Sequence, residues 1–148
     1  MAFLFDTDAI SEVLRKHPLD AYVEWLRGVP REEQFTSAVV IGELYKGAYR
    51  SAARERHLAN IRERVLPAVT VLPYDVAVAR VFGEARAHLE TAGTVLADAD
   101  LQIAATAIHH DLRLVTGNVR HFGRIPRLQI ESALAEARRS HSPPGDDG

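Results

Sequence analysis

Short, mostly apolar segments alternate with longer helical patterns along this chain. The segments are FLF at 3–5, QFTSA at 34–38, VTVLPYD at 69–75, LRLVT at 112–116 and RLQI at 127–130. A strand without polar alternation is buried on both faces, which is typical of a parallel sheet with helices on either side. The pattern therefore predicts an α/β fold with three α/β/α layers and a central, mostly parallel sheet of about five strands.

Helical patterns fill the intervals between these segments. They are predicted at 7–16, 19–28, 39–50, 51–65, 75–91, 98–110 and 131–139. Pro18, Gly28 and Pro67 mark helix ends. A chain of 148 residues is long enough for one domain. We assign residues 1–140 to that domain and residues 141–148, which are rich in Pro, Gly and Asp, to a flexible C-terminal tail.

The composition is that of a soluble globular protein. Hydrophobic residues make up 47% and charged residues 26% of the chain. No segment approaches the roughly 18 uninterrupted apolar residues of a membrane span. Because cysteine is absent and no basic leader precedes an apolar segment, we expect a cytoplasmic protein without a membrane partner.

The charge pattern is compatible with two interpretations. A net charge of −2 does not indicate a general nucleic-acid binder. Arginines nevertheless gather in two segments, with Arg50, Arg54, Arg56, Arg62 and Arg64 in the first and Arg113, Arg120, Arg124 and Arg127 in the second. They are either phosphate-binding groups or solvated helix faces with acidic partners.

Polar residues follow the predicted strands at the ends where ligands bind in parallel sheets. Carboxyl ends of parallel strands share one edge of the sheet, together with the first turns of the helices that follow them. The residues expected at this edge are Asp6, Glu43, Asp98, Asp100, Thr116, Asn118 and His121. We therefore expect a polar site there.

Each acid also has a local structural explanation. Asp98 is a candidate N-cap, and Asp100 is a first-turn acid that the helix dipole favours. Glu43 lies beside Lys46 and Arg50 on the same helical pattern, so a surface ion pair would explain it as well.

Asp6 is harder to explain locally, because Asp8 is better spaced to cap the following helix. Three or four carboxylates at one edge would repel one another unless a cation lay among them. Carboxylates without thiolates select a hard ion such as Mg²⁺ or Mn²⁺, which activates water for phosphodiester or phosphoryl transfer. An aspartate-nucleophile phosphatase and a response-regulator receiver domain share the acidic start, but both need a late lysine, and none follows Lys46.

Three longer motifs, in order and at matching spacing, resemble a known family. FDTDAIS, TSAVVIGELYKGA and DADLQIAATAIHHDLRLVTGNVRHF are similar to PIN-domain ribonucleases of the VapC toxin type, over Phe3 to about Ile130. The resemblance implies an endoribonuclease that uses Mg²⁺ or Mn²⁺, cleaves structured RNA such as tRNA or rRNA, is inhibited by a VapB-type antitoxin and forms a homodimer. It also implies catalytic roles for Asp6, Glu43 and Asp100, with Asp6 and Asp100 as metal ligands.

The chain departs from this family at one position. The residue before the aromatic Phe122 is commonly acidic in such toxins and is His121 here, whereas Thr116 and Asn118 match the pattern. Asp98 could supply a substitute acid. His121 is either an exposed histidine without a role, a group near the metal that favours Mn²⁺, or a contact to RNA phosphate.

Two further hypotheses concern binding. The alternative to an enzyme is a PIN-like module that binds RNA or protein and holds metal too weakly for turnover. The second hypothesis is that four aromatic residues line a groove for an antitoxin, because aromatic side chains anchor interfaces. They are Tyr22, Trp25, Tyr45 and Tyr49.

Overall fold

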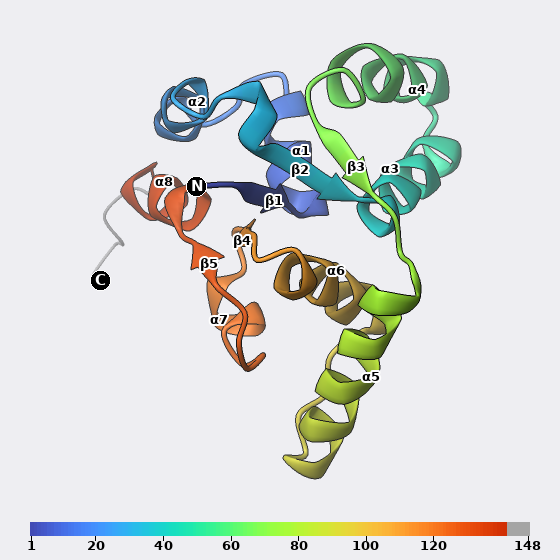
Figure 1. Cartoon of the computed structure of the whole chain (residues 1–148). Helices are drawn as coiled ribbons and strands as arrows, with labels where there is room; N and C mark the ends of the chain where they lie inside the picture. The colour runs from blue at the N-terminus through green and yellow to red at the C-terminus, as the bar shows by residue number, and fades with distance from the viewer. Residues whose placement is uncertain (142–148) are drawn as a thin grey trace, which may run out of the picture.

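The computed structural model describes residues 1–141 and contains the predicted alternation of strands and helices (Figure 1). The strands are β1 (Phe3–Phe5), β2 (Gln34–Ser37), β3 (Thr70–Leu72), β4 (Arg113–Val115) and β5 (Ile130–Glu131). The α-helices are α1 (Thr7–Leu14), α2 (Asp20–Arg27), α3 (Ala38–Arg50), α4 (Arg54–Asn60), α5 (Val76–Thr91), α6 (Asp98–His109), α7 (Val119–Phe122) and α8 (Ala133–His141). A 3₁₀ turn, η1 (Arg31–Glu33), precedes β2, and a π-helical turn, η2 (Ile61–Val65), continues α4.

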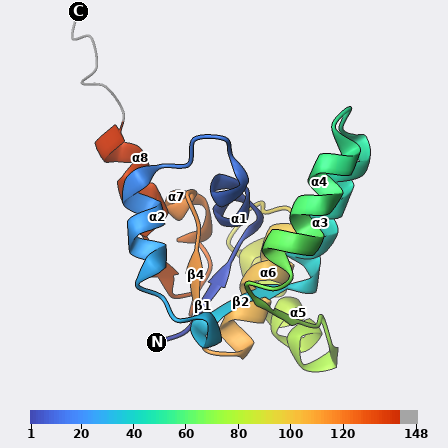
Figure 2. The ribbon, with the colours of Figure 1, turned by 90° about the horizontal axis from the view of Figure 1, so that it is seen from above.

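The sheet confirms the predicted fold class. The five strands run in the order β3-β2-β1-β4-β5, and every neighbouring pair is parallel. The middle strand β1 pairs with both neighbours, with Leu4 opposite Phe35 on one side and Leu114 on the other. Helices α2 and α8 cover one face of the sheet, and α3, α5 and α6 lie on the other (Figure 2).

Most differences from the predicted elements occur at their ends, but β5 (Ile130–Glu131) shares only Ile130 with the strand predicted at 127–130. The first helix ends at Leu14 rather than at residue 16, and the turns η1 and α7 were not predicted because a single turn has no clear periodicity. His141 is the last residue of α8, so the predicted tail begins at least one residue later. The rest of that tail, 142–148, lies outside the described residues.

The aromatic residues of α2 belong to the hydrophobic core. Tyr22 is fully buried, and its hydroxyl donates a hydrogen bond of 3.1 Å to the carbonyl of Ala9. Trp25 packs edge-on against Phe3, with ring centroids 5.3 Å apart. The predicted role in an antitoxin groove is therefore wrong for Tyr22, which joins α2 to α1, whereas Trp25 is partly buried and joins α2 to the central strand.

The other aromatic pair lies on α3. Tyr45 and Tyr49 stack with their ring centroids 6.5 Å apart, and Tyr49 is 56% exposed. Of the helices that the structure describes, none combines the length and the apolar character needed to cross a bilayer.

Candidate active site

Asp6 lies at the junction between β1 and α1, where it serves as the helix N-cap. Its carboxylate accepts a hydrogen bond of 2.8 Å from the backbone N–H of Ala9. The prediction that Asp8 caps this helix is wrong, because the helix begins at Thr7 and Asp8 lies within its first turn. Capping holds the Asp6 carboxylate at the carboxyl edge of the sheet.

A cavity of about 240 Å³ lies at this edge, next to Asp6. It is lined by Asp6, Thr7, Asp8, Glu43, Asp100, Ile103, Asn118, His121 and Phe122. The structure thus brings together five of the seven predicted residues, from segments that follow β1, β2 and β4 or open α6. The sixth, Thr116, is fully buried and hydrogen-bonds to Asp6.

Asp98 is the predicted residue that the fold places elsewhere. The N-cap of α6 is Ala97, so Asp98 does not cap the helix. Its side chain is 76% exposed and accepts a hydrogen bond of 2.7 Å from Arg86 on α5. Asp98 is absent from the cavity lining, and the hypothesis that it replaces the missing acid is wrong.

Burial makes the charge on Asp6 costly. Only 5% of the residue is exposed, and this desolvation raises the pKa of its carboxyl from 3.8 to about 6. Hydrogen bonds from Thr116 and from the backbone of Ala9 favour the charged form, whereas Asp8 and Asp100 disfavour it by repulsion. The site therefore holds a carboxylate whose charge the protein compensates only in part.

Glu43 faces the cavity from α3. Ser37 caps this helix through a 3.1 Å hydrogen bond with the N–H of Val40, which sets the start of α3 at the end of β2. One carboxylate oxygen of Glu43, Oε1, accepts a hydrogen bond of 2.6 Å from the hydroxyl of Thr7. Within the described part of the chain no ion pair joins Glu43 to Lys46 or Arg50, so the surface-pair explanation is wrong.

Asp100 and His121 meet across the cavity. Nε2 of His121 lies 3.0 Å from Oδ2 of Asp100, although the two residues are 21 positions apart. The His121 side chain is 24% exposed and that of Asp100 is 34% exposed. His121 belongs to the short helix α7 and lines the cavity, so it is not an exposed histidine without contacts.

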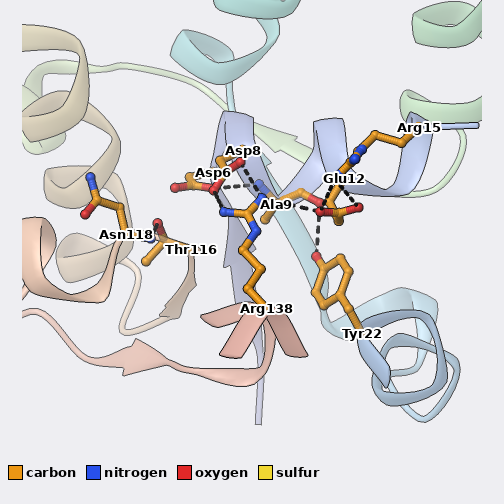
Figure 3. A network of polar contacts seen from close by, with 9 residues as sticks. All are labelled: Asp6, Asp8, Ala9, Glu12, Arg15, Tyr22, Thr116, Asn118 and Arg138. Carbon is orange, nitrogen blue, oxygen red and sulfur yellow. Dashed lines mark hydrogen bonds and ion pairs between the residues drawn. The ribbon is translucent and has the colours of Figure 1, made fainter. Parts of the chain in front are cut away.

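An ion-pair network that the sequence did not reveal reaches this cavity through Asp8 (Figure 3). Arg138 of α8 donates hydrogen bonds of 2.7 and 2.8 Å to the two oxygens of Asp8 and one of 3.4 Å to Glu12. The Glu12 side chain is fully buried, and Arg15 also contacts it at 3.2 Å. The hydrogen bonds with Asp8 are the main reason that the pKa of Arg138 lies above its usual value.

The same network explains the glycine of the LVTGN motif. A Cβ atom at Gly117 would collide with the Arg138 guanidinium and would lie 2.6 Å from Oδ2 of Asp8. Any larger residue would displace the ion pair. In the sequence, a glycine at this position indicates that another group lies close to the backbone, but it does not identify that group as Arg138.

The donor types around the cavity fit a hard divalent cation. Asp6, Glu43 and Asp100 provide carboxylate oxygens only, the ligands that Mg²⁺ and Mn²⁺ prefer, and the charge on buried Asp6 is compensated only in part. In the region covered by the structure, no three His, Asp or Glu side chains are grouped closely enough to surround an ion. Thr7, His121 and Arg138 instead engage the acids that accompany Asp6.

A larger groove adjoins the cavity and shares Thr7 and Glu43 with it. Its volume is about 930 Å³, and α1, α3, α4 and η2 line it. Apolar side chains of the groove include Leu14, Leu44 and Ile61, and its cationic ones are Arg15, Lys16, Arg56 and Arg64. The acidic cavity thus opens beside a surface of opposite charge.

Comparison with known proteins identifies similar chains. The family model of the PIN domain matches residues 3–128. The chain is 35% identical to "Toxin FitB" of Neisseria gonorrhoeae over 124 residues, which cover 80% of this chain and 89% of that protein. It is 32% identical to the "tRNA(fMet)-specific endonuclease VapC" of Salmonella typhimurium over 131 residues, which cover 88% and 97% of the two chains.

A solved structure has the same fold. The chain superposes on a protein in the crystal structure of VapBC2 from Rickettsia felis bound to a promoter DNA fragment, with a TM-score of 0.81 and 29% sequence identity. The match covers 88% of this chain and 98% of that one.

We predict that Arg138→Met lowers the free energy of unfolding by about 2–3 kcal/mol, because the buried Glu12 and the partly exposed Asp8 would both lose the guanidinium as a partner. The loss should stay below that of a fully buried pair, since Asp8 and Arg138 are 42% and 38% exposed. Urea unfolding measures it. Arg139→Met is the matched control on the same helix and should change stability by less than about 0.5 kcal/mol. Equal effects of the two substitutions would contradict the role of the network.

We also predict a pH-dependent gain in stability for Asp6→Asn, measured by urea unfolding in EDTA. The pKa of Asp6 in the folded protein lies above its unfolded value, so the folded state takes up this proton first as the pH falls. Charged Asp6 therefore costs stability above pH 6, and this cost disappears as the pH falls toward 4. Asparagine still caps the helix, so the variant should gain up to about 3 kcal/mol at neutral pH and almost nothing near pH 4. A gain that does not depend on pH would disprove the explanation.

Proposed function

The chain belongs to the PIN-domain family, and from this premise we propose that it is a VapC-type toxin, an endoribonuclease that hydrolyses phosphodiester bonds in RNA with a divalent cation. The observation that carries the proposal is the convergence of Asp6, Glu43 and Asp100 on one cavity. They come from the end of β1, from α3 and from α6, so no single local motif brings them together.

In this proposal Asp6 and Asp100 would hold Mg²⁺ or Mn²⁺. When bound, the cation would lower the pKa of a water molecule and offset negative charge on the phosphate. Asp6 contributes a carboxylate that is already oriented by its hydrogen bonds with Ala9 and Thr116. Thr7 orients Glu43 through Oε1, and the second oxygen of Glu43 accepts the proton of the attacking water.

The proposed substrate is a structured RNA, with tRNA as the first candidate. A relative that is 32% identical carries a name specific for tRNA(fMet). The groove beside the cavity supports RNA as the ligand, because Arg15, Lys16, Arg56 and Arg64 can neutralise phosphates on either side of the cleaved bond.

The proposed partners are an antitoxin of the VapB type and a second copy of the chain. The name "Toxin FitB" and the VapBC2 complex support the antitoxin. The homodimer follows from the family resemblance and can be tested by sedimentation equilibrium.

A second candidate function is an RNA-binding or protein-binding module without turnover. One observation favours it: three acids of the cavity already have hydrogen-bond partners, which leaves fewer of their oxygens for a cation. The pairs are Glu43 with Thr7, Asp8 with Arg138 and Asp100 with His121. Cleavage by the purified chain separates the two functions.

We predict that the purified chain cleaves tRNA in Mg²⁺ or Mn²⁺ and that EDTA abolishes the activity. Asp6→Asn and Asp100→Asn should each lower the cleavage rate at least about 100-fold, because a catalytic cation contributes several kcal/mol of transition-state stabilisation. Gel analysis of labelled RNA measures the rate.

Asp98→Asn is the matched control, because Asp98 lies two residues before Asp100 and outside the cavity. It should keep the parental cleavage rate within about twofold. The metal-nuclease proposal fails if Asp6→Asn and Asp98→Asn retain the same activity, provided that thermal unfolding shows both variants folded.

A further inference from the structure

His121 occupies the position before Phe122 where the sequence led us to expect an acid. It lies in α7, which begins directly after Asn118, and its ring lines the cavity. Both ring nitrogens have partners: Nε2 lies 3.0 Å from Oδ2 of Asp100, and Nδ1 lies 3.0 Å from Nη2 of Arg124. The imidazole therefore bridges an acid of the site and an arginine outside it.

Arg124 determines which nitrogen of His121 carries the proton. A guanidinium has only N–H donors, so Nδ1 must accept the hydrogen bond and must be unprotonated. Arg124 is itself held in place, because its Nε donates to the carbonyl of His121 at 3.2 Å and its Nη2 to that of Val95 at 3.4 Å. The neutral imidazole then carries its hydrogen on Nε2.

The hydrogen on Nε2 points to Asp100. It donates to Oδ2, which limits rotation of the carboxylate and leaves Oδ1 for the cation. We propose that His121 is a positioning residue that orients Asp100 through Nε2–H, that Arg124 sets the tautomer required for this bond, and that His121 is therefore neither a metal ligand nor a phosphate contact.

The negative charge of the cavity favours a neutral hydrogen-bond donor over an acid at position 121. The cavity already contains Asp6, Asp8, Glu43 and Asp100. A carboxylate placed 3.0 Å from Asp100, where Nε2 now lies, would repel it. A neutral N–H instead donates a hydrogen bond to the Asp100 carboxylate without adding charge.

The first test uses the metal-free protein and does not depend on activity, although the inference rests on the proposed function. Two-dimensional NMR of protein labelled with ¹⁵N at histidine should show His121 with Nδ1 unprotonated and Nε2 protonated. Arg124→Met should shift His121 toward a mixture of tautomers, whereas the control Arg120→Met, next to His121 in α7, should not. A protonated Nδ1 in the parent, or no response to Arg124→Met, would overturn the assignment.

The second test separates positioning from ligation by kinetics. His121→Gln keeps an N–H near the position of Nε2 and should retain kcat within about threefold, whereas His121→Ala should lose about 10–100-fold, the usual effect of removing the partner of a metal-ligating group. KM for RNA should stay within about twofold of the parental value in both variants, because neither substitution touches the proposed phosphate contacts.

His121→Asp decides between the two roles. If His121 positions Asp100, His121→Asp should lower kcat at least as much as His121→Ala does, because the new carboxylate would face that of Asp100. If His121 were instead a metal ligand, His121→Asp should have a higher kcat than His121→Gln. A higher kcat for His121→Asp would therefore overturn the proposal. His109→Ala, at the exposed end of α6, controls for loss of a histidine. An inactive parent would contradict the proposed function and leave the NMR result to decide the role of His121.

Discussion

The buried carboxylate of Asp6 is the constraint on which the rest of the site depends. It ends the central strand, caps α1 and lines the cavity, so one side chain joins the sheet, the first helix and the site. Capping needs a charged or polar oxygen at this point, and burial makes that charge expensive. The raised pKa, about 6, shows that the hydrogen bonds of Ala9 and Thr116 offset only part of this cost.

Each of the acids that accompany Asp6 in the cavity has a hydrogen-bond donor, and Asp8 also has a cationic partner. Arg138 neutralises Asp8 from α8, His121 donates to Asp100 from α7, and the Thr7 hydroxyl donates to Glu43. These donors come from both ends of the described chain. The electrostatic balance of the site is thus a property of the whole domain, and α8 contributes to it without lining the cavity.

Asp98 and Asp100 illustrate why acids that are close in sequence need not act together. Both belong to the first turn of α6. Residues two positions apart on a helix point in directions about 160° apart, because each residue turns the helix by about 100°. Asp100 therefore faces the cavity while Asp98 faces Arg86 on α5. The DAD motif alone does not show which acid faces the cavity; the resemblance to PIN domains favours Asp100, and Asp100 is the acid of the two that lines the cavity.

Sequence patterns were enough to predict the layered parallel sheet and the edge where the cavity lies, with Asp6, Glu43 and Asp100 at that edge, because apolar runs, helical periodicity and strand order are local or topological signals. The groups that pair with these acids became evident only from the folded arrangement. Arg138 is 130 residues from Asp8, and His121 is 21 residues from Asp100. Such contacts depend on how α7 and α8 pack beside the central strands, and no spacing in the sequence encodes the direction of one side chain toward another across that distance.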